Sequence, residues 1–223
     1  MTPAWRAASL LAGVVLALVM LGLPVLIMTV PVYTSVLVVR TDAPARADLD
    51  VAQTRALAEE VRAFVAGAPG ATLPSTLADG RPAFDDKAVS HLGDVRVILA
   101  GARIATIAAA LVALAWIAWT FRIRRYRELA FSLTFGAWAV VALTACAALA
   151  ALTDFGRLFA AFHGLFFEAG TWQFPADALL IRLFPEPFWA SSGAVWGALA
   201  LAGAGILGAL RRRVRLRFER DEA

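Results

Sequence analysis

Four long apolar runs divide the chain into alternating apolar and polar stretches. Apolar residues dominate 8–30, 98–121, 130–152 and 188–210. A helix needs about 20 such residues to cross the hydrocarbon core of a bilayer, so each run predicts one membrane-spanning helix. The first run is long for a cleaved signal peptide and is typical of a signal anchor. The predicted fold is an all-α membrane protein with four transmembrane helices, forming a single integral membrane domain over 1–223.

The connections between these runs differ in character. Residues 40–96 mix acidic and basic side chains and predict an extracytoplasmic cap, or outer loop, between the first two transmembrane helices. Within it, apolar residues at helical spacing predict an amphipathic helix over Val51–Val65. Residues 153–187 are aromatic but interrupted by proline and charge. Because Trp and Phe favour the boundary between lipid and water, this segment is predicted to lie at the membrane surface.

Composition and charge agree with this topology. The 223 residues are 61% hydrophobic and 17% charged, with a formal net charge of +4. Arginines cluster in 122–127 and in the tail from Arg211, which predicts that both segments and both termini are cytoplasmic. The 40–96 and 153–187 connections then face outward from the cytoplasmic membrane. The arginine clusters flank the spans, so topology explains them without a nucleic-acid partner, and the single Cys146 excludes an internal disulfide.

The only two histidines of the chain, His91 and His163, fall on the same predicted side of the membrane. They are distant in sequence, but both lie near a membrane boundary and are expected to meet at one depth. Histidine moves protons near neutral pH. Asp94 stands one helical turn after His91, where a carboxylate can orient an imidazole. The alternative is that Asp94 pairs on the surface with Arg96 or Arg62.

Other chemistries have weaker support in the sequence. Arg103 lies near one end of the second span, where it either extends to the interface or holds an anionic or carbonyl group of a lipid. Two histidines with Asp94 or Glu168 are metal-ligand types, but the usual short-spaced ligand pair on one helix is missing, so no metal or cofactor is predicted. Ser90 and Ser191 lack the Gly-x-Ser-x-Gly pattern of a serine nucleophile.

Two motifs carry a resemblance. His91-Leu-Gly-Asp-Val-Arg96 precedes the second span, and Phe162-His-Gly-Leu-Phe-Phe167 opens the aromatic segment, which continues through Trp172 to Trp189. With four spans, this resembles the bacterial integral membrane family that contains lipoprotein intramolecular transacylase. The resemblance implies an enzyme at the outer face of the cytoplasmic membrane whose partners are a bacterial lipoprotein and membrane lipid. It implies transfer of the sn-2 acyl chain from the diacylglyceryl group to the amine of the lipoprotein's N-terminal cysteine.

The same resemblance implies a set of site residues. His91 and His163 would be the catalytic histidines. Independently of the resemblance, acyl transfer needs a donor for the developing negative charge, and Arg96, Arg103 or Arg182 is the candidate for this role. Further positions that correspond to the family's acidic and aromatic residues, or that lie beside the histidines, are Asp94, Glu168, Trp172, Asp177, Pro185 and Glu186. The chain departs from the family at Leu92, where an aromatic is expected, and its spacing from Trp172 to Asp177 is short. Its alanine- and arginine-rich composition is typical of an actinobacterial relative.

Two alternatives to an acyltransferase remain open from the sequence. One is a non-enzymatic membrane accessory or assembly protein, in which the aromatic segment is an interfacial helix and the histidines are ordinary polar residues. The other is a metal-dependent membrane hydrolase, which requires a third ligand beside the two histidines. The separation of the two imidazoles distinguishes the enzyme from the accessory protein.

Overall fold

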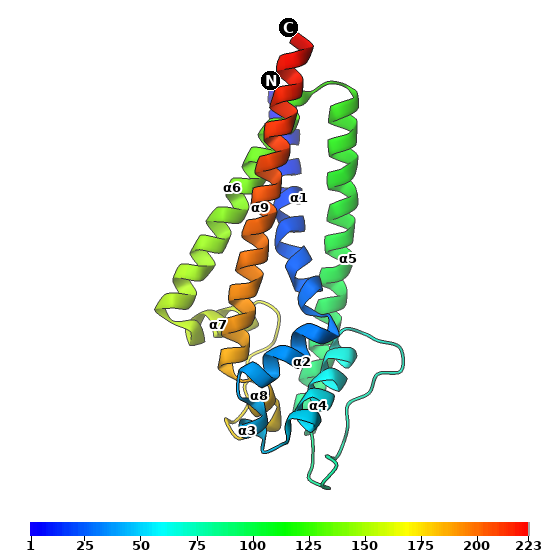
Figure 1. The fold of residues 1–223 in the computed structure, drawn as a ribbon, viewed down its shortest axis with the longest axis vertical. Helices are drawn as coiled ribbons and strands as arrows, with labels where there is room; N and C mark the ends of the chain where they lie inside the picture. Colours follow the sequence, from blue (N-terminus) through cyan, green and yellow to red (C-terminus); the bar gives the residue numbers. More distant parts are fainter. Residues whose placement is uncertain (223) are drawn as a thin grey trace. The chain divides into compact units, whose positions relative to one another are not determined.

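The computed structural model describes residues 1–222, and within this range its regular elements are all helices (Figure 1). In chain order they are α1 (Pro3–Met28), α2 (Pro31–Arg40), α3 (Ala43–Ala47), α4 (Val51–Val65), α5 (Asp86–Arg122), α6 (Tyr126–Thr153), α7 (Phe155–Gly164), α8 (Leu179–Leu183) and α9 (Glu186–Glu222). Four of them, α1, α5, α6 and α9, are long and apolar enough to cross a membrane. The predicted all-α class is therefore confirmed, and each of the four predicted runs lies in a helix with the length and apolar composition of a membrane span.

The chain divides into two compact units, and each is described by itself. The bundle unit comprises residues 1–25, 103–149 and the chain from Val195 onward, and so contains parts of the four long helices. The site unit comprises 26–102 and 150–194, and contains α2, α3, α4, α7, α8, the first part of α5 and the start of α9.

Close helix contacts hold the bundle unit together. A Cβ added at Gly136 of α6 would lie 2.9 Å from the carbonyl oxygen of Gly13 in α1, and one at Gly203 of α9 would lie 2.7 Å from the sulfur of Met20. Small residues at such positions let helix backbones approach, which is how helices associate within lipid. Large apolar side chains face outward, including Leu111, 64% exposed, and Trp138, 68% exposed. Such an exterior is typical of a lipid-facing surface.

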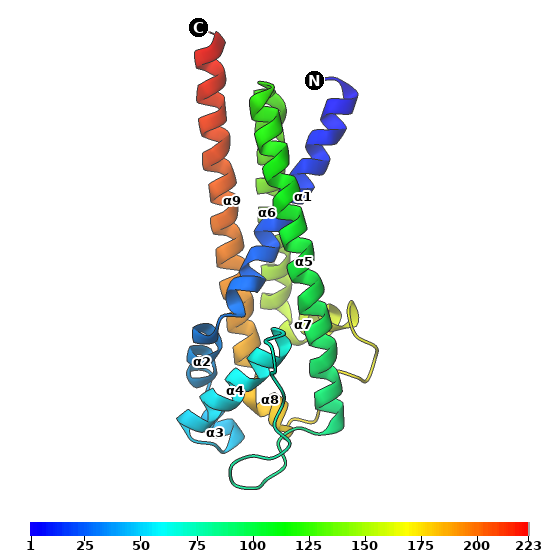
Figure 2. The ribbon, with the colours of Figure 1, turned by 90° about the vertical axis from the view of Figure 1, so that its right-hand side faces the viewer.

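The site unit has an apolar core that is closed by polar contacts. α2 packs against α4, as Figure 2 shows, and the core draws on α2, α3, α4, α5 and α8. Asp50 caps α4: its Oδ1 accepts from the backbone N–H of Gln53 at 2.8 Å, and Gln53 Oε1 accepts from the N–H of Asp50 at 3.1 Å. This reciprocal capping fixes the first turn. The helix predicted over 51–65 is confirmed with the same bounds.

Two long-range hydrogen bonds tie segments of the site unit to one another. The guanidinium of Arg62 in α4 donates to the carbonyl of Thr29 at 2.9 Å, and its other side pairs with Glu59. The hydroxyl of Tyr33 in α2 donates to Ser192 Oγ in α9 at 2.8 Å. The segment that follows α1 is thereby joined to both α4 and α9.

The predicted boundaries need correction at the polar ends of the helices. The first span ends at Met28 rather than at residue 30, because Pro31 starts α2 after an extended residue at Val30. Residues 86–96, predicted as the end of the outer loop, are the first turns of α5. The side chain of Asp85 accepts from the N–H of Ala88 at 2.7 Å and so starts that helix before the apolar run begins.

The aromatic segment and the tail are also more helical than the sequence predicted. Within 153–187, α7 covers Phe155–Gly164 and is capped by Asp154, whose Oδ1 accepts from the N–H of Arg157 at 2.8 Å, and α8 follows over Leu179–Leu183. The last helix begins at Glu186 and continues past residue 210 into the arginine-rich tail. Arginine has a high helix propensity, so the end of the apolar run does not end the helix.

Candidate active site

The two histidines come together within the site unit. His91 lies in the first turns of α5 and is only 8% exposed, and His163 lies near the end of α7. Their ring centroids are 6.3 Å apart, with 31° between the ring planes. Two segments more than 70 residues apart in sequence therefore place both imidazoles in one site. We refer to His91 and His163 as the histidine pair.

Aromatic rings surround the histidine pair. Phe167 and Phe174 lie 4.9 and 5.6 Å from the ring of His91. Phe159 and Trp172 lie 4.0 and 4.7 Å from the ring of His163. These rings take the place of water around the imidazoles. The local dielectric constant is therefore lower than in bulk solvent, which strengthens hydrogen bonds and charge interactions at the two rings.

The backbone of α7 determines the tautomer of His163. Its Nδ1 lies 2.9 Å from the carbonyl oxygen of Phe159. A carbonyl oxygen only accepts, so Nδ1 carries the hydrogen and donates it, and the neutral ring keeps its lone pair on Nε2. Burial lowers the pKa of His163 from its ordinary value of 6.5, and the bond to Phe159 opposes this in part. Near neutral pH His163 is therefore an uncharged base.

His91 presents a different environment. Its Nδ1 is buried and has no hydrogen-bond partner. A buried polar atom without a partner is costly unless a ligand or substrate completes it. Asp94 is exposed and forms no hydrogen bond with this nitrogen, so the orienting contact predicted for it is not made at Nδ1. The two arginines predicted as alternative partners of Asp94 have other contacts. Arg62 pairs with Glu59, and the guanidinium of Arg96 lies over the ring of Phe64 at 5.3 Å.

The remaining predicted residues are spread more widely. Trp172 lies against the histidine pair, whereas Glu168, Asp177 and Glu186 are exposed. Arg182 of α8 is half-buried, and its Nε is buried without a hydrogen-bond partner. Arg103 belongs to the bundle unit and not to the unit that holds the histidines.

The other proposed chemistries lack the side chains they need among the described residues. No group of three His, Cys, Asp or Glu side chains gathers in residues 1–219 with metal-ligand geometry, so the third ligand of the hydrolase alternative is missing there. Ser192 accepts its hydrogen bond from Tyr33 rather than from a histidine. The site therefore consists of two imidazoles and aromatic side chains.

Lys87 is a contributor that the sequence reasoning missed. Its ammonium group donates to the carbonyl of Gln173 at 2.6 Å and lies 5.0 Å from the ring centroid of Phe174. It thus connects the start of α5 to the aromatic segment beside His91. Phe159 was missed as well. Both stand four residues before a histidine, a spacing that places side chains on one helix face and would have indicated them.

Four spanning helices and a water-shielded histidine pair define a multi-pass membrane protein with a candidate acid–base site. The sequence profile of the family described as "Lipoprotein intramolecular transacylase Lit" matches residues 9–189, which is most of the chain. The chain therefore belongs to the lipoprotein intramolecular transacylase family.

Solved structures show the same fold. The membrane-integral lipoprotein intramolecular transacylase Lit of Bacillus cereus aligns with a TM-score of 0.84 at 16% identity, over 98% of this chain and 99% of that one. A variant of that protein with one histidine replaced by arginine gives 0.77 at 16% identity, over 99% and 95%. At this identity the likeness describes the fold alone.

One curated relative is an uncharacterized protein of Aquifex aeolicus (strain VF5), 29% identical over 113 residues. The match covers 51% of this chain and about half, 49%, of that relative. These comparisons do not support the actinobacterial origin, which stays a prediction.

Proposed function

We propose that this protein is an intramolecular transacylase of bacterial lipoproteins. It moves the sn-2 acyl chain from the diacylglyceryl group to the amine of the N-terminal cysteine. The observation that carries the proposal is the histidine pair, with ring centroids 6.3 Å apart, in a chain of this family. In an accessory protein the two imidazoles have no reason to meet, and their proximity favours the enzyme.

The separation of the two rings suits a reacting ester carbon and amine held between them. A general base or acid works at a hydrogen-bond distance of roughly 2.6–3.2 Å. In the tetrahedral intermediate the amine nitrogen and the glycerol oxygen are bonded to one carbon, so a histidine hydrogen-bonded to each of them lies close to the other. Rings with centroids 6.3 Å apart and planes inclined by 31° can adopt that arrangement. The enzyme then contributes positioning and proton transfer, because the substrate carries both the nucleophile and the acyl donor.

The proposed roles follow from the hydrogen bonds. The substrate amine attacks the ester carbonyl, so that an N–C bond forms and the C–O bond to glycerol breaks. His163 Nε2 accepts the proton that the amine loses, since Nδ1 is already bonded to Phe159. His91, protonated on both ring nitrogens, donates a proton to the departing glycerol oxygen and becomes neutral, so the pair carries one positive charge before and after the transfer. A proton returning from His163 to His91 restores the starting state.

The negative charge that develops on the ester oxygen needs a donor. Of the three arginines predicted for this role, Arg182 is favoured because its Nε–H is buried and unpartnered. The guanidinium of Arg96 lies over the ring of Phe64 instead. Asp94, Glu168, Asp177 and Glu186 are exposed, and we propose that they contact the polar part of the lipoprotein.

We further propose that both termini are cytoplasmic and that the site unit faces outward. The support is the distribution of arginines, which cluster in 122–127 and from Arg211. Alkaline phosphatase is active only outside the cytoplasm, which makes fusions to it a direct test. A fusion after Gly80 should be active and a fusion at the C-terminus inactive, and the reverse pattern would contradict this orientation.

The decisive test is replacement of the histidines. His163→Ala and His91→Ala should each lower transacylation about 10²- to 10⁴-fold, the usual contribution of a general acid or base. The readout is mass spectrometry of a lipoprotein N-terminus, which separates the lyso-form with an acylated amine from the diacylglyceryl form with a free amine. Glu60→Ala, on the exposed face of α4, is the matched control and should keep full activity.

Unchanged thermal unfolding in detergent would show that each histidine variant is folded. A folded His163→Ala protein with full activity would overturn the acid–base proposal. Absence of the lyso-form with the wild-type protein itself would favour an accessory role.

A further inference from the structure

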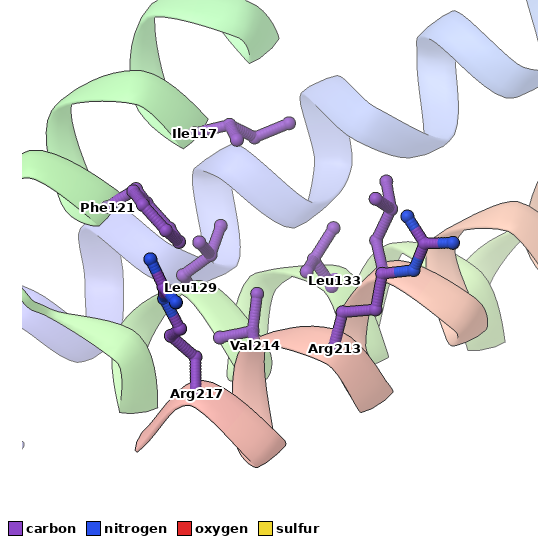
Figure 3. Close-up of a pocket in the computed structure, with 8 residues that line it drawn as sticks. Ile117, Phe121, Leu129, Leu133, Arg213, Val214 and Arg217 are labelled. Atoms are coloured by element: carbon purple, nitrogen blue, oxygen red, sulfur yellow. The ribbon is translucent and has the colours of Figure 1, made fainter. Parts of the chain in front are cut away.

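We propose that the bundle unit binds an anionic phospholipid in a second site, separate from the histidine pair. A pocket of about 320 Å³ opens in this unit (Figure 3). Its apolar walls come from three spanning helices: Ile117 and Phe121 of α5, Leu129 and Leu133 of α6, and Leu210 and Val214 of α9. Arg213 and Arg217 of α9 complete the lining.

The inner wall of this pocket suits a hydrocarbon chain. Leu129 and Leu133 are 1% exposed and Val214 is buried, so they form the packed apolar floor of the pocket. Leu210 and Phe121 are more exposed, at 37% and 43%. No polar side chain lines this part of the pocket. An acyl chain loses little on moving from the surrounding lipid into such a surface, and it gains the close contacts of a shaped groove.

The two arginines provide the polar part of the site. Arg213 and Arg217 are one helical turn apart and exposed, and Figure 3 shows them on either side of Val214. Guanidinium groups bind phosphate through paired hydrogen bonds in a planar fork. Four further arginines lie in 122–127, at the end of α5 and the start of α6. Among the side chains that the structure describes, Glu128 pairs with Arg125 and Glu219 pairs with Arg215.

An apolar groove with two guanidiniums at its edge matches a phospholipid, whose chains and anionic phosphate are covalently joined. Free phosphate would leave the apolar walls without a contact, and a zwitterionic lipid would place a second, positive group beside the arginines. Basic pockets between spanning helices bind anionic head groups in this way. The site does not depend on the transacylase activity.

Native mass spectrometry of the purified full chain in a neutral detergent tests the site. Dioleoylphosphatidylglycerol should remain bound at least about tenfold more tightly than dioleoylphosphatidylcholine. The double variant Arg213→Gln with Arg217→Gln should lose about 25-fold in affinity for phosphatidylglycerol, since each arginine near a lipid surface favours anionic lipid about fivefold. Arg212→Gln with Arg215→Gln removes the same charge from the same helix outside this pocket and should change affinity less than threefold.

A second variant separates the apolar groove from the charge. Leu210→Trp puts a bulkier side chain into the lining of the pocket and keeps both arginines, so it should also weaken phosphatidylglycerol binding. Three results would each overturn the proposal. The first is an equal loss of affinity in the two double variants, the second is equal binding of the two lipids, and the third is displacement of phosphatidylglycerol by millimolar inorganic phosphate. Thermal unfolding of all variants in the same detergent confirms that the bundle is intact.

Discussion

α5 contributes to both units, and its two parts are stabilised in different ways. From residue 103 onward it belongs to the bundle unit, where large apolar side chains such as Leu111 face outward. Over residues 86–102 it belongs to the site unit, where Lys87 and His91 contact the aromatic segment. In lipid the exposure of apolar surface carries no penalty, so the bundle relies on close backbone approach. The site unit relies on helix caps, hydrogen bonds and aromatic contacts. The two units should therefore respond to different substitutions.

The largest expected effect on stability is in the bundle unit. Gly136→Ala should lower the free energy of unfolding by about 1–3 kcal/mol, because the new Cβ would lie 2.9 Å from the Gly13 carbonyl. Thermal unfolding in detergent measures the loss. Gly205→Ala in α9 is the control, since nothing lies within 4 Å of its Cβ position, and it should be neutral or stabilising. Equal stability of the two variants would mean that close approach is not what holds the bundle.

The second effect concerns the pKa of His163 and the pH dependence of the reaction rate. His163 must be neutral to act as a base, and burial lowers its pKa below 6.5, so the acid limb of the pH–rate profile should lie below pH 6.5. Trp172→Ala removes a ring 4.7 Å from the imidazole, lets water in and should move this limb toward higher pH. Trp138→Ala, on the outer face of the bundle unit, should leave the limb in place. An unmoved limb in the Trp172 variant would show that this ring does not shield His163.

His163 also makes the stability of the fold depend on pH, and because its pKa is lowered in the folded state, stability should fall at acid pH. Above pH 6.5 His163 is neutral in both folded and unfolded states and its contribution to stability is complete. As the pH falls, the unfolded state takes up the proton first, so stability is lost through the lower pKa of the folded state. His163→Gln should reduce this pH dependence of thermal unfolding.

A smaller effect is expected at the cap of α4. Asp50→Ala removes an acceptor for the N–H of Gln53 and should cost about 1 kcal/mol of stability. Glu60→Ala on the same helix should cost much less, because it removes no cap. Thermal unfolding compares the two variants. Transacylation by the Asp50 variant should stay near normal at low temperature, and a selective loss of activity would place α4 closer to the chemistry than we infer.

The smallest effect is expected at Lys87. Lys87→Met removes the bond to the Gln173 carbonyl and the contact with Phe174, which is worth about 0.5–1 kcal/mol at an exposed position. The specificity constant kcat/KM should fall twofold to fivefold while thermal unfolding changes little. Lys87→Arg keeps the charge and should recover most of the activity. Failure of this rescue, or no effect of Lys87→Met, would exclude a positioning role.

The apolar pattern was sufficient to predict the fold. Four runs of about 20 apolar residues required four spanning helices, and the amphipathic spacing of 51–65 located α4. The pattern failed where a polar stretch is helical. Residues 86–96 are polar enough to be read as a loop, yet the cap at Asp85 extends α5 through them. The short helix α7 was missed although Phe155, Leu158, Phe159 and Phe162 recur at helical spacing, because 153–187 was interpreted as one aromatic segment interrupted by proline and charge.

The candidate site was predictable only in outline. Topology placed His91 and His163 on one side, and the contact between them is consistent with that reasoning. The partners of each ring were not predictable, because they come from packing between distant segments. Asp94 is near His91 in sequence but is exposed, whereas Phe174 is far away and lies 5.6 Å from its ring. Sequence proximity therefore predicted Asp94 as the partner of His91, whereas tertiary packing places Phe174 beside it.

The contact between Gly13 and Gly136 limits how the sequence can vary. At each of them an added Cβ would meet the main chain of the other helix, namely the Ser132 carbonyl for Gly13 and the Gly13 carbonyl for Gly136. A side chain can be trimmed to accommodate a larger neighbour, but a carbonyl group is present whatever the residue. At Gly136 the closest contact is with a carbonyl, so no side-chain exchange removes it and epistatic rescue is not expected. At Gly13 the closest contact, 2.7 Å, is with the ring of Phe135, so a smaller side chain at 135 should restore part of the stability.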